Sequence, residues 1–150
     1  MMRAETDQHE RTLMAWPTEV RRSFFGGHLT AARRAWAGVA RAIADFEPVT
    51  MVVNPGERSS AEALLAEVVN ASRHEVELVE LAIDDAWMRD SGPVVVRDRG
   101  VKTGDDRLAI QFGFNAWGEL VQPFDNDAAV ATAGAEHLGR AATRAPCGSA

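Results

Sequence analysis

The sequence predicts a mixed α/β fold, because short β-branched runs alternate with longer amphipathic segments along the chain. Val49–Val53 and Val76–Leu81 have the composition of strands. Apolar residues between residues 29 and 47 recur at helical spacing. The 150 residues are 46% hydrophobic and 25% charged, which is typical of a globular chain and excludes disorder of the whole.

The first predicted strand is Leu13–Trp16, a short apolar run that Pro17 stops. The next element is a helix of about four turns that begins at Leu29 and ends before Pro48. Three arginines lie largely off its apolar stripe: Arg33, Arg34 and Arg41. The stripe itself is predicted to contain Leu29, Ala32, Trp36, Val39, Ala40 and Ile43.

The strand Val49–Val53 is expected to be buried and to end at the turn signal Asn54-Pro55-Gly56. The run from Ser59 to Glu62 matches a capping box, which predicts a second helix that continues to Val68. The strand Val76–Leu81 follows that helix. This half of the chain therefore alternates strand, helix, strand, helix and strand.

The second half begins with two predicted strands, Pro93–Arg97 and Leu108–Phe114, joined by a short polar loop. Asp127 is expected to cap a last helix that ends at Gly139. No exact internal repeat is visible in the sequence.

Charge and composition exclude several classes of protein. The formal net charge is −6 and the arginines are scattered, which argues against a nucleic-acid binder. No run approaches the roughly 18 apolar residues of a membrane span, and the polar start has no secretory h-region, so the cytoplasm is expected. Cys147 is the single cysteine, which excludes an internal disulfide, and its Pro-Gly-Ser surroundings predict an inert thiol.

The segment Asp84–Pro93 is the densest in chemically useful side chains, with three carboxylates and a tryptophan directly after an apolar strand. The face of the Trp87 ring attracts a cation, and the Asp90 carboxylate can accept two parallel bonds from a guanidinium. The two residues are three apart, which predicts that they share one side of a helical turn. Together they would hold a planar cation.

Structural interpretations of the same residues remain open. Asp90 is followed by Ser-Gly-Pro and suits a turn in which its side chain bonds its own backbone. Trp87 suits a core position. Arg89 could form an ion pair with Asp84 or Asp85 instead of acting in a site.

Three ordered motifs carry a family resemblance: His9–Thr12 running into Met14–Pro17, the segment Asp84–Pro93, and Phe114–Gly118. Together they resemble the agmatine deiminases, whose wider group includes bacterial peptidyl-arginine deiminases. The resemblance implies a pseudo-fivefold α/β propeller, the pentein fold, built of ββαβ units. It also implies that residues 1–139 are the N-terminal portion of a single propeller domain and that residues 140–150 are a divergent tail.

The activity that the resemblance implies is hydrolysis of agmatine to N-carbamoylputrescine and ammonia, in the route to putrescine, without a metal or cofactor. By motif position, Asp90 is the catalytic carboxylate that binds the guanidinium, and Trp87 is a wall of the substrate pocket. Asp85, Arg89 and Trp117 fall in matching blocks and are expected to support the substrate site. Glu119 stands where relatives commonly have a second glycine.

The family's nucleophilic cysteine and catalytic histidine lie in downstream motifs that have no counterpart in this chain. We therefore expect the chain by itself to be catalytically incomplete. Two alternatives are a non-catalytic guanidinium-binding fragment and a peptidyl-arginine deiminase. Because part of a closed propeller exposes strand edges and apolar faces, weak stability or a homo-oligomer is also expected.

Overall fold

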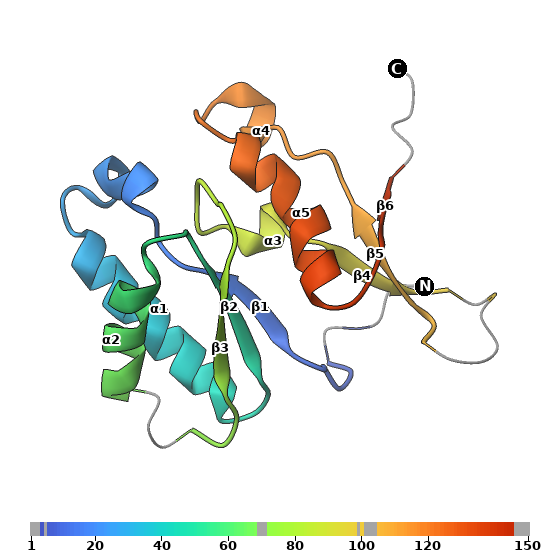
Figure 1. Cartoon of the computed structure of the whole chain (residues 1–150), viewed down its shortest axis with the longest axis horizontal. Coiled ribbons are helices and arrows are strands. Elements are labelled where there is room, and N and C mark those ends of the chain that lie inside the picture. Colours follow the sequence, from blue (N-terminus) through green and yellow to red (C-terminus); the bar gives the residue numbers. More distant parts are fainter. Residues whose placement is uncertain (1–3, 5, 69–71, 99, 101–104, 146–150) are drawn as a thin grey trace. The chain divides into compact units, whose positions relative to one another are not determined.

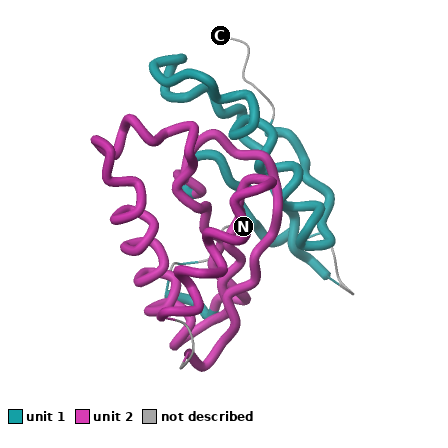
Figure 2. The backbone as a smooth tube through the Cα atoms, turned by 60° about the vertical axis from the view of Figure 1, so that its left-hand side comes forward, with its two compact units in different colours: residues 1–8, 89–150 teal, residues 9–88 magenta. Residues whose placement is uncertain are grey.

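The computed structural model describes residues 4, 6–68, 72–98, 100 and 105–145. They separate into two compact units, which Figure 2 shows in different colours. Unit 2 contains residues 9–88, and unit 1 contains residues 1–8 and 89–150. The alternation of strands and helices in both units confirms the predicted α/β class.

Unit 2 is a three-stranded parallel sheet in the order β1 (Thr12–Ala15), β2 (Val49–Val53), β3 (Val76–Glu80). Parallel neighbours need crossover connections, which α1 (Leu29–Ala44) and α2 (Arg58–Val68) provide. Both helices lie on the same side of the sheet (Figure 1). Every residue of β2 is buried, which explains why all of them except Thr50 are apolar.

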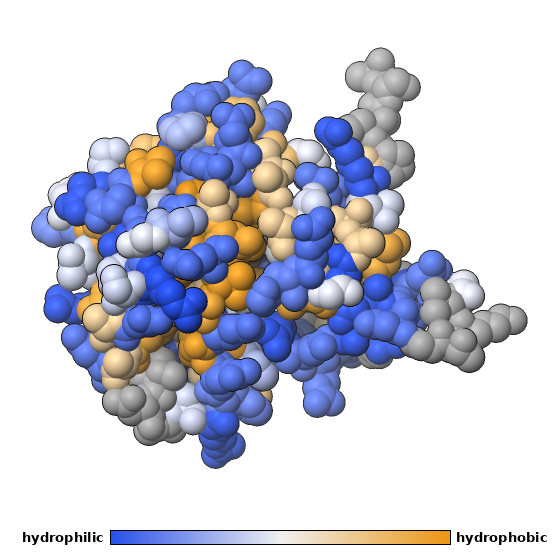
Figure 3. Space-filling view, in the orientation of Figure 1, coloured by the Kyte–Doolittle hydropathy of each residue, from blue (hydrophilic) through white to orange (hydrophobic). Residues whose placement is uncertain are grey.

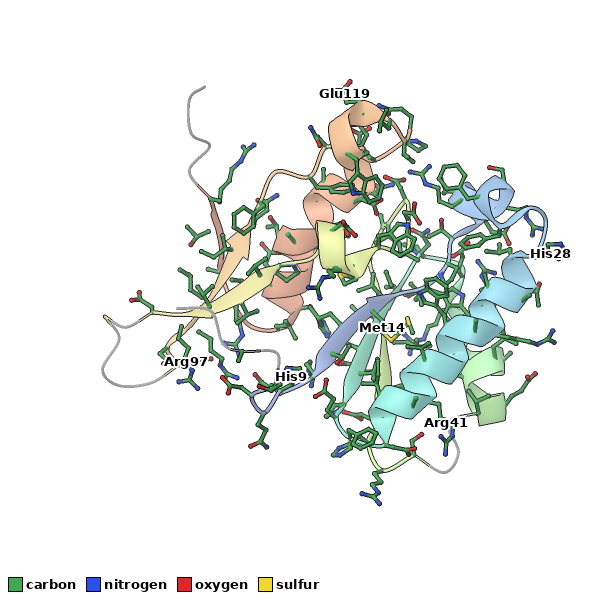
Figure 4. The ribbon with its side chains drawn as sticks, turned by 180° about the vertical axis from the view of Figure 1, so that it is seen from behind. His9, Met14, His28, Arg41, Arg97 and Glu119 are labelled. Atoms are coloured by element: carbon green, nitrogen blue, oxygen red, sulfur yellow. The ribbon has the colours of Figure 1, made fainter. Side chains whose placement is uncertain are left out.

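The core of unit 2 lies between β2 and α1. Val49, Met51 and Val53 share one face of the strand and belong to the same apolar cluster as Ala37 and Ala40 of the helix. Met14 of β1 packs against this cluster and points to the helix side of the sheet (Figure 4). Alanines on α1 let the helix approach the sheet closely.

The predicted stripe of α1 is wrong in two places. Arg33, expected off the stripe, is buried, whereas Val39, expected on it, is 51% exposed. Arg33 can be buried because its charge is paired: Nε donates to the carbonyl oxygen of Pro17 at 2.8 Å, and Nη2 lies within ion-pair distance of Glu57, at 3.1 Å.

The capping box predicted for α2 is also wrong. The helix begins at Arg58, so Ser59 lies inside its first turn. Glu62 accepts a hydrogen bond from the Arg58 Nε at 2.8 Å, an i,i+4 ion pair on the helix surface. Ser60 donates to the carbonyl oxygen of Glu57 at 2.8 Å. A capping box would pair the Glu62 carboxylate with a backbone amide at the start of the helix. In the structure, Glu62 pairs with the Arg58 side chain instead.

Unit 1 contains a second sheet in the order β4 (Val94–Arg97), β5 (Arg107–Gln111), β6 (Ala142–Arg144). The first pair is antiparallel and the second is parallel. The helix α5 (Asp125–His137) connects β5 to β6 (Figure 1). Its buried residues are Asp127, Val130, Ala131 and Ala135.

Three details of unit 1 differ from the sequence prediction. The strand β5 ends at Gln111, three residues before the predicted end at Phe114. The helix α5 begins at Asp125, so Asp127 is a buried residue of its first turn and does not cap it. The strand β6 falls in the predicted tail and pairs with β5.

Short helices complete the described chain: the 3-10 helix η1 (Glu19–Phe25), α3 (Met88–Ser91) and α4 (Ala116–Glu119). In η1 the Thr18 side chain accepts a hydrogen bond from the Arg21 amide, and Gly26 closes the helix at φ +54°. None of the helices in the described ranges is long and apolar enough to cross a membrane.

The surface of the described chain mixes polar and apolar residues, as Figure 3 shows for one face. Hydrophilic side chains surround patches of apolar atoms in that view. The large apolar side chains that are exposed are Val20, Phe24, Val39, Phe46, Trp87, Val95, Phe112, Trp117 and Leu120.

Candidate functional site

In unit 2, the segment that follows β3 is held by buried polar contacts. The Arg21 Nε lies 3.2 Å from Asp85 Oδ2, and both side chains are less than a tenth exposed. Asp85 Oδ1 also accepts a hydrogen bond from the Ala86 amide at 2.7 Å. Thr18 donates to the carbonyl oxygen of Asp84 at 2.6 Å. The segment is therefore tied to η1 and its N-cap through Asp84 and Asp85.

Sequence reasoning missed Arg21, because it lies 64 residues from Asp85 and no periodic pattern links the two. Asp85 thus pairs with Arg21, whereas the alternative named from the sequence was an ion pair with Arg89. A buried arginine paired with a carboxylate is costly to break, since the remaining charge would be left without compensation. Asp85 is accordingly a residue that fixes the backbone next to Trp87.

Trp87 is 51% exposed, so it does not occupy the core position that was one interpretation of this residue. Its ring packs edge to face against Trp36 of α1, with centroids 6.4 Å apart and an interplanar angle of 75°. The helix α3 begins at Met88, so Trp87 immediately precedes the helical turn that contains Asp90. The prediction that both residues share one turn is wrong in that detail.

In unit 1, Asp90 and Trp117 come together from segments 27 residues apart. Trp117 Nε1 donates a hydrogen bond to Asp90 Oδ1 at 3.3 Å. Both residues line an open hollow of about 200 Å³, whose other lining residues are Phe112, Gly113, Phe114 and Asn115. The hollow combines a carboxylate with aromatic rings, which are groups that can bind a cation. Trp87, the ring that the sequence paired with Asp90, is not among its lining residues.

The backbone beside the hollow adopts an unusual conformation. Ala116, Trp117, Gly118 and Glu119 all have positive φ angles, of 49°, 56°, 84° and 63°. The left-handed region costs a non-glycine residue about 1–2 kcal/mol, and strain of this kind is concentrated at functional sites. Asn115 stabilises the turn, since its side chain accepts a bond from the Gly118 amide at 3.1 Å.

Trp117 is held on its other side by Phe114. The two rings are edge to face, with centroids 5.4 Å apart and an interplanar angle of 85°. Glu119, by contrast, is exposed, and its side chain points outward from the tip of the turn (Figure 4). The left-handed turn thus directs Trp117 to the hollow and Glu119 to solvent.

Arg89 is exposed on α3. Cys147 lies outside the described residues. His9 precedes β1 in the chain (Figure 4), with Nδ1 3.2 Å from the Glu47 carboxylate. In the described part of the chain, no group of three or more His, Cys, Asp or Glu residues could hold a metal ion.

Two exposed carboxyl groups have a pKa below the ordinary value. Arg107 and Arg140 donate hydrogen bonds to Asp105 and hold the pKa of its carboxyl group well below the usual range. The Arg22 guanidinium lowers the pKa of Glu19 in the same way. These groups stabilise local ion pairs on exposed surfaces.

Relatives of known name resemble this chain over most of its length. The agmatine deiminase of Pseudomonas aeruginosa is 41% identical over 118 residues, which cover 78% of this chain and 28% of that protein. A Streptomyces coelicolor protein provisionally named an agmatine deiminase is 46% identical over 118 residues, covering 78% of this chain and 31% of that protein. The chain therefore spans about a third of the length of these relatives.

The solved agmatine deiminase of Enterococcus faecalis superposes on 97% of this chain with a TM-score of 0.77, at 26% identity and over 37% of its own length. The α/β architecture described above is therefore part of a pentein fold, as the motifs implied. The sequence profile of the Porphyromonas-type peptidyl-arginine deiminase family matches residues 1–147, which includes most of the predicted divergent tail. The chain belongs to the Porphyromonas-type peptidyl-arginine deiminase family.

Proposed function

We propose that this chain carries the guanidinium-binding part of an agmatine deiminase site. The observation that supports the proposal most directly is the hollow in unit 1, where the exposed Asp90 carboxylate lies among aromatic rings. A carboxylate can bind a guanidinium through two parallel hydrogen bonds, and the aromatic faces add cation–π attraction. Relatives of this chain are named for agmatine, whose reactive head is a guanidinium.

The proposed roles follow from the surroundings of each side chain. Asp90 binds the guanidinium, and Trp117 of the same unit provides aromatic surface for it. The role of Trp87 as a pocket wall stays a prediction from its motif. Asp85 is occupied by Arg21, so its support is indirect and consists of fixing the segment before Trp87. Arg89, exposed one residue before Asp90, supports the site from the same short helix.

The complete reaction would convert agmatine and water to N-carbamoylputrescine and ammonia. Hydrolysis of a resonance-stabilised guanidinium requires a strong nucleophile, for which a thiolate and a proton-transferring histidine are suited. The motifs that hold these two groups in the resembled family have no counterpart in this sequence. We therefore expect the chain to bind agmatine and to release no ammonia.

Isothermal titration calorimetry with agmatine tests the binding function. Asp90→Asn removes one charge with little change of shape and should weaken binding about tenfold or more. Asp125→Asn is the matched control, because it removes one exposed charge from the same unit and should leave binding unchanged. Putrescine, which lacks the guanidinium, should bind much more weakly than agmatine. Equal affinity of the wild-type chain and Asp90→Asn would refute the assignment.

A peptidyl-arginine substrate is the second candidate, because the matching family is described by that activity and the hollow is open to solvent. An arginine blocked at both ends by amide bonds represents such a substrate. Tighter binding of this compound than of agmatine would favour the second candidate. Weaker binding would favour agmatine.

The proposal includes a cytoplasmic location and assembly of several copies of the chain. Assembly is supported by the exposed apolar side chains, since surface of this kind marks protein contacts. Sedimentation velocity at increasing protein concentration tests it, and a concentration-independent monomer would refute it.

A further inference from the structure

Asp90 is an exposed residue on a helix of only four residues. An aspartate in such a position would ordinarily exchange between rotamers, and a ligand would have to select one of them. The hydrogen bond from Trp117 Nε1 favours one orientation of the carboxylate before any ligand arrives. The indole N–H is a donor only, so it suits a carboxylate partner.

Trp117 can fix Asp90 only if Trp117 is itself fixed. Its backbone is part of the left-handed turn, which is closed by two bonds to Asn115: one from the Gly118 amide to the side chain, and one from the Glu119 amide to the carbonyl oxygen. Its ring is packed edge to face against Phe114. Both the backbone and the ring of Trp117 are therefore restrained.

We propose that Trp117 is a positioning residue, whose indole N–H orients the Asp90 carboxylate to receive a guanidinium. This inference rests on the proposed function, in which Asp90 binds a guanidinium. It adds that the Trp117 side chain orients the carboxylate before the guanidinium binds. Trp117 Nε1 engages Oδ1, so Oδ2 is the oxygen that receives the first guanidinium N–H. The alternative is that Trp117 contributes only an apolar wall, in which case its nitrogen is irrelevant.

The decisive variant replaces Trp117 by β-(3-benzothienyl)alanine, an isostere in which sulfur replaces the N–H group. The apolar wall is kept and the donor is lost. Agmatine affinity measured by calorimetry should fall about tenfold, the typical effect of one hydrogen bond to a charged group. In an Asp90→Asn background the same replacement should cause no further loss, because the charged partner is gone. Unchanged affinity of the single variant would overturn the proposal.

A second measurement needs no ligand and separates this proposal from the proposed function. The chain has four tryptophans, whose indole N–H resonances can be assigned by single Trp→Phe variants. Asp90→Asn should shift the Trp117 indole resonance and leave those of Trp16 and Trp36 in place. If this shift occurs and wild-type protein binds no agmatine, the orienting contact stands and the proposed function fails. If no shift occurs, the contact is absent and the positioning role is wrong.

Discussion

Glu119→Gly should stabilise the protein, although glycine substitutions usually have the opposite effect. Glu119 has a φ angle of 63°, a conformation that costs a residue with a side chain about 1–2 kcal/mol. Its side chain is exposed and points outward, so its removal sacrifices no packing (Figure 4). The bond from its backbone amide to the Asn115 carbonyl oxygen does not depend on the side chain.

The size of the effect follows from two opposing contributions to the free energy of unfolding. Relief of the left-handed strain adds about 1–2 kcal/mol to stability. The additional freedom of a glycine in the unfolded chain removes about 0.4–1 kcal/mol. The expected net stabilisation is therefore about 0.8 kcal/mol, within a range of about 0 to 1.6 kcal/mol.

Urea unfolding followed by circular dichroism measures this change as a shift of the midpoint at constant m-value. Ala129→Gly is the control, because Ala129 is exposed within α5 of the same unit and glycine there should cost about 1 kcal/mol. Opposite shifts of the two midpoints are expected. A loss of stability in Glu119→Gly as large as that in Ala129→Gly would show that the turn is not strained.

Two further predictions concern ion pairs outside the hollow. Arg21→Met should destabilise the protein by about 3 kcal/mol or more in urea unfolding, because it leaves the Asp85 carboxylate buried without its cation. A loss below about 1 kcal/mol would show that the pair is not buried in solution. Asp105 has a lowered pKa in the folded state, so its contribution to stability is present above the ordinary value of 3.8 and declines as the pH falls below it. Asp105→Asn should make stability less dependent on pH below that value, and an unchanged pH profile would contradict the ion pairs with Arg107 and Arg140.

The strands and long helices could be predicted because their signals are local. The run of β-branched and apolar residues in β2 predicts a buried strand, and the structure confirms it. The helix α1 was predicted to begin at Leu29, and it does. Its stripe was misjudged because hydrophobicity alone does not show that Arg33 can reach the Pro17 carbonyl oxygen and Glu57.

The candidate site was predictable only in part, because its geometry depends on contacts distant in sequence. The motif around Asp90 and the separate motif around Trp117 are both predicted to contribute to a substrate site, but nothing in the residues predicts the hydrogen bond between them. The ion pair of Arg21 with Asp85 also joins residues distant in sequence, so the sequence does not predict it either. Residue types indicated which groups take part, and the fold determines which of them meet.

The left-handed turn shows why local rules fail at this position. Ala116 and Trp117 are not residues that favour positive φ, and a sequence reading that follows propensity alone would not place them there. The turn nevertheless forms, since Asn115 satisfies two of its amides and Phe114 packs against its tryptophan. These contacts offset a local strain that brings an indole N–H to a carboxylate. The turn is disfavoured by the conformational preferences of its own residues and is stabilised by the contacts around it. Contacts of this kind hold a binding group in one orientation before the ligand arrives, which is preorganisation.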